Sequence, residues 1–268
     1  MMRAMPRSPR SHPIQLLPVS GIPEIKRGDD LARLLYRACR LSGTPLRGGD
    51  VLVVAQKVVS KAEGATVELS SVRPSEKALE LARRRAATRS GPAKADDPRL
   101  LEVVLGQSRR IVRDEHVLIV ETHHGLVCAN AGVDHSIVPG EDRVTLLPRD
   151  PDRSAARLAR ALGRLTGKPV AVIISDTFGR PWRLGLTNVA IGAAGLPVLL
   201  DLRGKPDRTG KRLEATIVAV ADELAAAAGL AMGKARGIPA VIIRGYPFPA
   251  SRGRARDLLR PAQEDLFR

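Results

Sequence analysis

The sequence predicts an α+β fold in which mixed or antiparallel sheets pack against helices. Short aliphatic runs with the length of buried strands occur at residues 51–55, 117–120, 170–174, 216–220 and 240–243. Helical patterns lie between only some of these runs, and the segment 118–133 contains strand candidates joined by turns alone. This order favours an α+β fold over a doubly wound parallel sheet, in which strands and helices alternate.

Helical patterns occupy longer segments. Residues 75–89 begin with Ser75 as a plausible N-cap and end in arginines, which suits the helix dipole. Residues 152–165 place apolar side chains on one face, and Gly167 follows as a stop signal. Residues 222–234 are rich in alanine and leucine. Because aromatic residues make up only 2% of the chain, the core between these elements must be aliphatic.

The length of 268 residues suits one large domain or two small ones. We expect residues 14–249 to form the folded part, which could consist of two interleaved lobes. A disordered basic tail at residues 1–13 and a C-terminal tail at residues 250–268 would flank it, and the polar segment 91–97 is expected to be a surface loop.

Membrane and secretion signals are missing from the sequence. No apolar run approaches the roughly 20 residues of a membrane helix. The basic N-terminus is not followed by the apolar stretch of a secretory signal. Cys39 and Cys128 belong to no paired motif, so a reducing cytoplasm is the expected location.

The net charge of +16 has two interpretations. One is a nucleic-acid-binding protein with a phosphate-directed basic surface, and the other is an enzyme whose small ligands are polyanions. The arginines are not interleaved with aromatic residues for base stacking, and no zinc-finger or RNA-binding motif accompanies them. Solvated helix faces are the commonest location of such charges. We keep nucleic-acid binding as the alternative function.

Polar segments that follow predicted strands are candidates for a binding site. Gln56 and Lys61 come directly after the run 51–55, and a lysine at a strand end can neutralise a phosphate, although an ordinary exposed lysine fits equally well. Asp134 follows a run of small residues and is a suitable ligand for Mg²⁺ or Mn²⁺. His123 and His124 do not suggest zinc, because adjacent histidines on a strand point to opposite faces.

The segment 175–183 contains the most informative group of polar residues. Asp176 and Thr177 place a carboxylate beside a hydroxyl, a common way to hold a phosphate-bound divalent ion. Arg180 and Arg183 can each donate two hydrogen bonds to a phosphate or carboxylate. A turn in which Asp176 and Thr177 cap backbone amides remains the structural alternative. The sequence has no G-x-x-x-x-G-K-S/T motif, so a nucleotide would need another kind of phosphate site.

These motifs occur in an order that resembles one family. GIPEI, VVSKAEG, VCANAGVD, IISDTFGRPWR and ADELAAAAGLAMGK follow one another between about residues 17 and 245. This arrangement resembles the coenzyme F420:L-glutamate ligase family. The resemblance implies a GTP-dependent ligase without a P-loop that adds L-glutamate to coenzyme F420-0 through γ-linked amide bonds. It also implies two Mg²⁺ or Mn²⁺ ions, with K⁺ as a further candidate, and a homodimer of intertwined α+β subunits.

The resemblance assigns roles position by position. The metal residues would be Asp134, Asp176 and Thr177, and we expect Asp134, Asp176, Arg180 and Arg183 to serve the reaction. The nucleotide contacts would be Ile22, Pro23, Glu24, Ile25, Gln56, Lys61, Ala231, Met232, Gly233 and Lys234.

Three positions depart from the family pattern. Many relatives have Ser or Thr in place of Gln56, and Asn in place of Ile137. Where some archaeal relatives carry an acidic or amide residue, this chain has Lys234, which cannot bind a metal while charged but can hold a phosphate.

The expected reaction begins with transfer of the GTP γ-phosphoryl group to a carboxylate of the coenzyme. The resulting acyl phosphate would react with the amine of L-glutamate, with release of phosphate. Besides a nucleic-acid-binding protein, a non-catalytic relative that binds the nucleotide or the coenzyme is an alternative.

Overall fold

The computed structural model describes residues 13–87, 96–134, 142–234 and 236–265. Within these ranges helices pack on mixed and antiparallel sheets, which confirms the predicted α+β fold class. The basic tail up to residue 12, most of the predicted 91–97 loop and Ile137 lie outside the described residues. No helix within them is long and apolar enough to cross a membrane.

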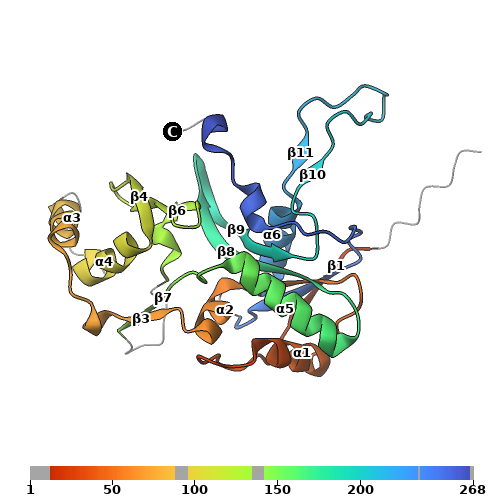
Figure 1. The fold of residues 1–268 in the computed structure, drawn as a ribbon, viewed down its shortest axis with the longest axis horizontal. Helices are drawn as coiled ribbons and strands as arrows, with labels where there is room; N and C mark the ends of the chain where they lie inside the picture. The colour runs from red at the N-terminus through yellow and green to blue at the C-terminus, as the bar shows by residue number, and fades with distance from the viewer. Residues whose placement is uncertain (1–12, 88–95, 135–141, 235, 266–268) are drawn as a thin grey trace, which may run out of the picture.

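A five-stranded mixed sheet forms the centre of the molecule (Figure 1). β2 and β8 are parallel, whereas the other neighbouring pairs are antiparallel. The parallel pair is therefore flanked by the antiparallel β1–β12 pair on one side and by β9 on the other. In spatial order the strands are β1 (Gln15–Val19), β12 (Ala240–Arg244), β2 (Val51–Ala55), β8 (Ala171–Arg180) and β9 (Arg183–Ala194).

Helices cover both faces of this sheet, because alternate side chains of each strand point to opposite faces. Leu52 and Val54 of β2 pack in one hydrophobic cluster with α1 (Leu31–Leu41), α2 (Gln56–Glu63) and α5 (Pro151–Thr166). Val51 and Val53 pack in a second cluster with α6 (Val220–Met232) on the other face. The central strands are therefore continuous apolar runs, as expected for strands buried on both faces.

A third hydrophobic cluster lies apart from the main sheet, around the α3–α4 pair (Figure 1). It is covered by a three-stranded antiparallel sheet in the order β4–β5–β6, and a short β3–β7 pair connects it with α2. Its elements are β3 (Thr66–Glu68), the 3₁₀ helix η1 (Leu69–Ser71), α3 (Glu76–Ala87), α4 (Pro98–Gly106), β4 (Ser108–Arg113), β5 (Ile119–Thr122), β6 (Val127–Ala129), η3 (Asn130–Gly132) and β7 (Arg143–Thr145).

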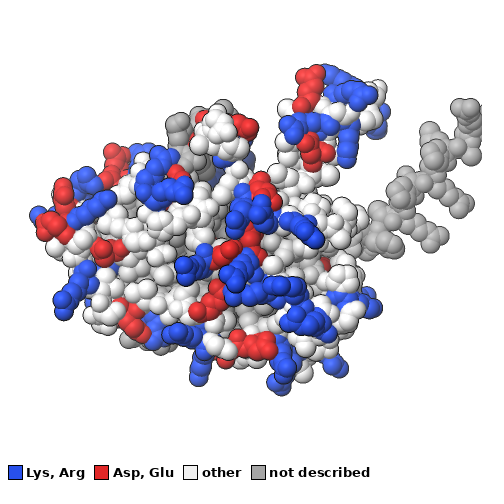
Figure 2. All heavy atoms as spheres, in the orientation of Figure 1, with Lys and Arg blue, Asp and Glu red and all other residues white. Residues whose placement is uncertain are grey.

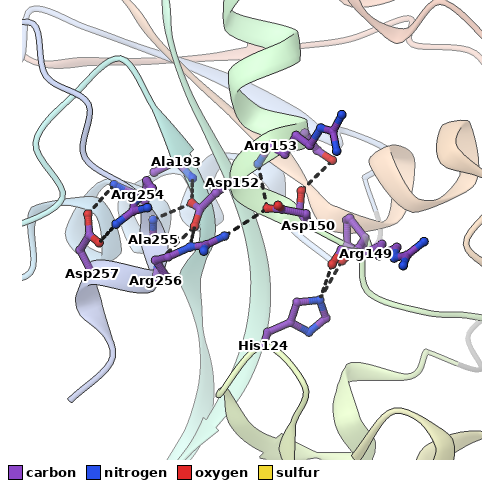
Figure 3. A network of polar contacts seen from close by, with 12 residues as sticks. His124, Arg149, Asp150, Asp152, Arg153, Ala193, Arg254, Ala255, Arg256 and Asp257 are labelled. Carbon is purple, nitrogen blue, oxygen red and sulfur yellow. Dashed lines mark hydrogen bonds and ion pairs between the residues drawn. The ribbon is translucent and has the colours of Figure 1, made fainter. Parts of the chain in front are cut away.

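One buried carboxylate fastens the C-terminal segment to the body (Figure 3). Asp152, in the first turn of α5, accepts hydrogen bonds from the backbone N–H groups of Ala193 (2.9 Å), Ala255 (2.7 Å) and Arg256 (3.3 Å), and from Arg256 Nε (3.2 Å). The 3₁₀ helices η4 (Ala255–Leu258) and η5 (Ala262–Glu264) belong to this segment. Part of the expected C-terminal tail is therefore packed against α5 and β9.

A thin arm projects from the body between β9 and α6 (Figure 1). It contains the short antiparallel strands β10 (Leu200–Asp201) and β11 (Ile217–Val218). The predicted strand at residues 216–220 was therefore wrong in its second half, because Val220 begins helix α6 instead. The apolar run there is too short to distinguish a strand from the first turn of a buried helix.

The prediction was also wrong in ending the strand at residue 174. β8 continues to Arg180, because its second half pairs with β9 in a long hairpin, with Thr177 opposite Asn188. The run 117–120 begins pairing only at Ile119, and the polar segment after β2 forms helix α2. Among the helices, α5 and α6 match their predictions within two residues at each end, and the Ser75 hydroxyl caps α3 through the N–H of Ala78 (3.3 Å).

Candidate active site

A cavity of about 430 Å³ lies beside the parallel β2–β8 pair, where Ala55 is paired with Ser175. The loop after β1, the first turns of α2, the extended half of β8 and the end of α6 surround it. Most of the residues predicted for the site line this cavity, namely Ile22, Pro23, Glu24, Ile25, Gln56, Lys61, Asp134, Asp176, Thr177, Met232, Gly233 and Lys234.

Asp134 and Asp176 reach the cavity from distant segments. Asp134 forms a two-way backbone bridge with Thr145, with both N–H···O distances at 2.9 Å, so its position is fixed by β7. Its carboxylate forms an ion pair with Lys57 at 2.6 Å. Asp176 lies within β8 opposite Val189, and its Oδ1 accepts the N–H of Thr177 at 2.8 Å. The side-chain-to-backbone hydrogen bond expected for the alternative of a turn is therefore present, although Asp176 and Thr177 lie in a strand.

The environment of Asp176 disfavours its negative charge. Burial, together with the nearby charge of Asp134, raises the pKa of this carboxyl to about 6. The backbone N–H of Thr177 and the charges of Lys234 and Lys57 act in the opposite direction. Two carboxylates that share a largely buried site would be stabilised by a cation between them. Within the described residues, however, no cluster of three or more His, Cys, Asp or Glu side chains could hold a metal ion.

Thr177 is hydrogen-bonded on both sides. Its hydroxyl donates to Asn188 Oδ1 at 3.0 Å, across the β8–β9 pair, and accepts a hydrogen bond from Lys234 Nζ at 2.5 Å. Lys234 reaches this place because α6 ends at Gly233, whose φ of +58° and ψ of 148° are accessible to glycine with little strain. The end of α6 therefore delivers an ammonium group to the extended half of β8.

Two further predicted nucleotide residues already have protein partners. Lys61 forms an ion pair with Glu24. Gln56 is buried at the start of α2, where its Oε1 accepts the Ser60 hydroxyl at 2.8 Å. A ligand in the cavity would meet Lys61 and Glu24 as a preformed pair, whereas Gln56 is oriented by its own helix.

Other predicted residues are not brought to this cavity. Ala231 lies on α6 but does not line it. Arg180 and Arg183 lie at the tip of the β8–β9 hairpin, where Arg180 donates to the backbone oxygen of Leu184 at 2.5 Å. Trp182 at this tip is 82% exposed. Arg180 lies four residues beyond Asp176 on β8, and neither arginine lines the cavity that holds the two aspartates.

The two histidines lie in a turn and not on a strand, so the geometric reason given against zinc was wrong. They follow β5, and their Nε2 atoms contact backbone oxygens, of Gly106 for His123 (3.1 Å) and of Pro148 for His124 (3.0 Å).

The cavity also contains residues that sequence reasoning missed. Lys57 pairs with Asp134, Asn188 holds Thr177, and the hydroxyl of Ser175 is buried without a hydrogen-bond partner. Lys57 was detectable in principle, since it neighbours Gln56 in the first turn of α2. Asn188 could not be recognised from its neighbours in the sequence, because its contact with Thr177 depends on which residue of β8 lies opposite in the sheet.

The cavity is lined by oxygen atoms and several ammonium groups, and it belongs to an α+β fold whose sequence lacks a P-loop. Such a site is suited to phosphate-bearing ligands and a hard cation. The family model for F420-0:gamma-glutamyl ligase matches residues 21–245. The chain belongs to this family, as the order of its motifs predicted.

Individual relatives agree with the family match. The chain is similar to the coenzyme F420:L-glutamate ligase of Methanothermobacter thermautotrophicus, with 49% identity over 95% of this chain and 99% of that protein. The proteins of the same name from Methanocaldococcus jannaschii and Archaeoglobus fulgidus are 43% and 42% identical. These matches cover 84% and 95% of this chain, and 86% and 96% of the respective relatives.

Proposed function

We propose that this protein is a GTP-dependent ligase that joins L-glutamate to coenzyme F420-0 through an amide bond and then adds further glutamates in γ-linkage. The observation that carries the proposal is the convergence of Asp134, Asp176 and Thr177 with the predicted nucleotide residues in one cavity. The family match and the names of the relatives support the substrate and the type of bond.

The proposed chemistry has two steps. A carboxylate oxygen of the coenzyme attacks the γ-phosphorus of GTP, and the bond between this phosphorus and the β-phosphate oxygen breaks. GDP is the leaving group, and the product is an acyl phosphate of the coenzyme. The neutral α-amine of L-glutamate then attacks the acyl carbon, phosphate departs with the bonding electron pair, and the nitrogen loses a proton to give the amide. Activation is required because a free carboxylate is a poor electrophile.

The protein groups of the cavity suit this chemistry. Lys57 and Lys61 line the cavity and can hold phosphate oxygens as point charges. The loop at residues 22–25 and the end of α6 both line the cavity, so a nucleotide bound there would contact both segments. These residues would bind and position the nucleotide.

The residues present fit a divalent cation. Asp134 and Asp176 supply oxygen ligands, which Mg²⁺ and Mn²⁺ prefer, and a bound cation would favour the charged form of Asp176, whose pKa is raised chiefly by burial. When bound, such an ion would neutralise phosphate charge that develops during the transfer. The same two side chains would hold it.

An activity assay tests the proposal. The purified chain is incubated with GTP, Mn²⁺, L-glutamate and coenzyme F420-0, and the products are followed by mass spectrometry. We expect glutamylated coenzyme and an equal amount of GDP, and we expect Asp176→Ala to reduce the rate by roughly a hundredfold or more, because charge stabilisation by a metal is worth several kcal/mol. Unchanged ligation by this variant would refute the assigned site.

The alternative functions predict other results. A non-catalytic relative would bind GTP without forming GDP. A nucleic-acid-binding protein would retain duplex DNA at physiological salt, in a salt-dependent manner. Figure 2 shows that lysines and arginines on the visible face are interspersed with acidic side chains, a distribution that supports a solvated surface more than one continuous phosphate-binding surface.

We also propose a homodimer in which the tip of the β8–β9 hairpin is covered. Leu184, Trp182 and Leu186 are 97%, 82% and 65% exposed, so several large apolar side chains are grouped near this tip. Light scattering after size exclusion should give twice the chain mass of 28.8 kDa, and Leu184→Asp should shift the protein toward the monomer. A wild-type monomer at micromolar concentration would contradict this proposal. The matched control is Leu230→Asp, because Leu230 is 80% exposed on α6.

A further inference from the structure

Lys234 lies where a cation bound to Thr177 would lie. Its Nζ contacts Thr177 Oγ1 at 2.5 Å, while the proton of that hydroxyl points to Asn188. The threonine therefore already has one cationic partner supplied by the chain. A protonated lysine has no lone pair and cannot itself become a metal ligand.

The charges around the cavity are already balanced without a second divalent ion. Its lining includes the carboxylates of Glu24, Asp134 and Asp176, and the ammonium groups of Lys57, Lys61 and Lys234. Lys61 pairs with Glu24 and Lys57 with Asp134, and Asp176 Oδ1 accepts the N–H of Thr177. One divalent ion between Asp134 and Asp176 would find oxygen ligands on both carboxylates.

A second divalent ion on Thr177 would meet a different environment. It would share the hydroxyl oxygen with the Lys234 ammonium group, and two cations at such short separation repel each other. Lysine holds phosphate oxygens as a point charge, so an ammonium fixed here can replace the charge of a metal ion without providing coordination.

We propose that Lys234 takes the place of a second divalent cation, so that this chain binds a single Mg²⁺ or Mn²⁺ between Asp134 and Asp176. Lys234 then acts as a positioning residue for the triphosphate, held over β8 by Thr177 and by the end of α6. The inference rests on the proposed function, because it assumes a nucleotide and a divalent ion in this cavity.

Counting bound Mn²⁺ in the presence of GDP tests the inference without measuring activity. Isothermal titration calorimetry and the loss of the free Mn²⁺ electron paramagnetic resonance signal both give the stoichiometry. We expect one Mn²⁺ per wild-type chain and two for Lys234→Gln, whose amide oxygen can coordinate the second ion. Lys234→Arg keeps the positive charge and should stay at one.

Lys205→Gln is the matched control, because it removes an exposed lysine from the β10–β11 arm and should also leave the stoichiometry at one. A wild-type count of two would overturn the inference and leave the proposed function intact, and this result does not depend on any variant folding. A count of one for a folded Lys234→Gln protein would also overturn it. A wild-type protein that binds no Mn²⁺ and forms no GDP would instead refute the proposed function.

Discussion

At the scale of single residues, the folded protein disfavours the negatively charged form of Asp176. The carboxylate is largely buried and close to Asp134, and its pKa of about 6 lies above the ordinary value of 3.8. The folded, metal-free protein therefore binds a proton more tightly than the unfolded chain does. Ionisation of this group destabilises the fold, so the associated stability is present below pH 4 and is lost as the pH rises through about 6.

Asp176→Asn should remove this pH dependence. The amide keeps an oxygen that can accept the N–H of Thr177, but it carries no charge. In the presence of EDTA at pH 7.5, we expect the variant to gain on the order of 2 kcal/mol in free energy of unfolding, and to lose any stabilisation by Mn²⁺. Urea denaturation between pH 4.5 and 7.5 measures the effect.

The control for this prediction is Glu214→Gln, which removes an exposed carboxylate from the β10–β11 arm and should leave the wild-type profile unchanged. Equal pH profiles for wild type and Asp176→Asn would show that the carboxyl is not destabilised by its surroundings.

At the scale of secondary-structure elements, the end of α6 decides where Lys234 lies. Gly233 adopts φ of +58° and ψ of 148°, a combination that side chains with a Cβ rarely adopt, and a Cβ there would lie 3.0 Å from Arg236 Cδ. A residue other than glycine would either strain the backbone or redirect the chain. Either response would move the ammonium group away from Thr177.

Gly233→Ala is therefore expected to lower the free energy of unfolding by roughly 1–3 kcal/mol and to weaken GTP binding. Thermal unfolding and calorimetry with GTP provide the measurements. Gly106→Ala is the matched control, because Gly106 ends helix α4 without a positive φ and a Cβ there would meet open space. The prediction fails if both variants behave alike.

At the scale of the whole molecule, Asp152 joins three distant parts of the chain. It belongs to α5, and it receives hydrogen bonds from Ala193 at the end of β9 and from the C-terminal segment at Ala255 and Arg256 (Figure 3). A buried carboxylate with several donors leaves those donors unsatisfied when it is removed. The C-terminal segment would then lose its main polar attachment to α5.

Asp152→Ala should cost roughly 1–3 kcal/mol of stability and should release the C-terminal segment. Limited trypsin digestion, followed by mass spectrometry, should show faster cleavage after Arg254 and Arg256. Asp257→Ala removes only a local contact within η4, to Arg254, and should have a much smaller effect on cleavage after Arg256. Identical cleavage rates in the wild type and Asp152→Ala would contradict the role of this carboxylate.

Much of the local structure follows from the sequence, because it depends on short-range patterns. The aliphatic run at β2 and the amphipathic pattern of α5 identify these elements, since burial on two faces or one face leaves a periodic signature. Helix α2 was missed because it is only eight residues long and mostly polar, so it contains too few apolar positions to distinguish a short helix from a loop at a strand end. The extent of β8 was missed because its second half is stabilised by β9 and not by apolar burial.

By itself the sequence determined the α+β class, the family and the acidic and nucleotide-binding candidates, since motifs and aliphatic patterns are properties of neighbouring residues. The tertiary structure alone decided that Asp134 and Asp176 share a cavity, that Arg180 and Arg183 lie at a hairpin tip, and that Lys234 holds Thr177. These contacts depend on strand register and on the direction in which a helix ends. Both are set by packing between segments far apart in the chain, which local composition does not encode.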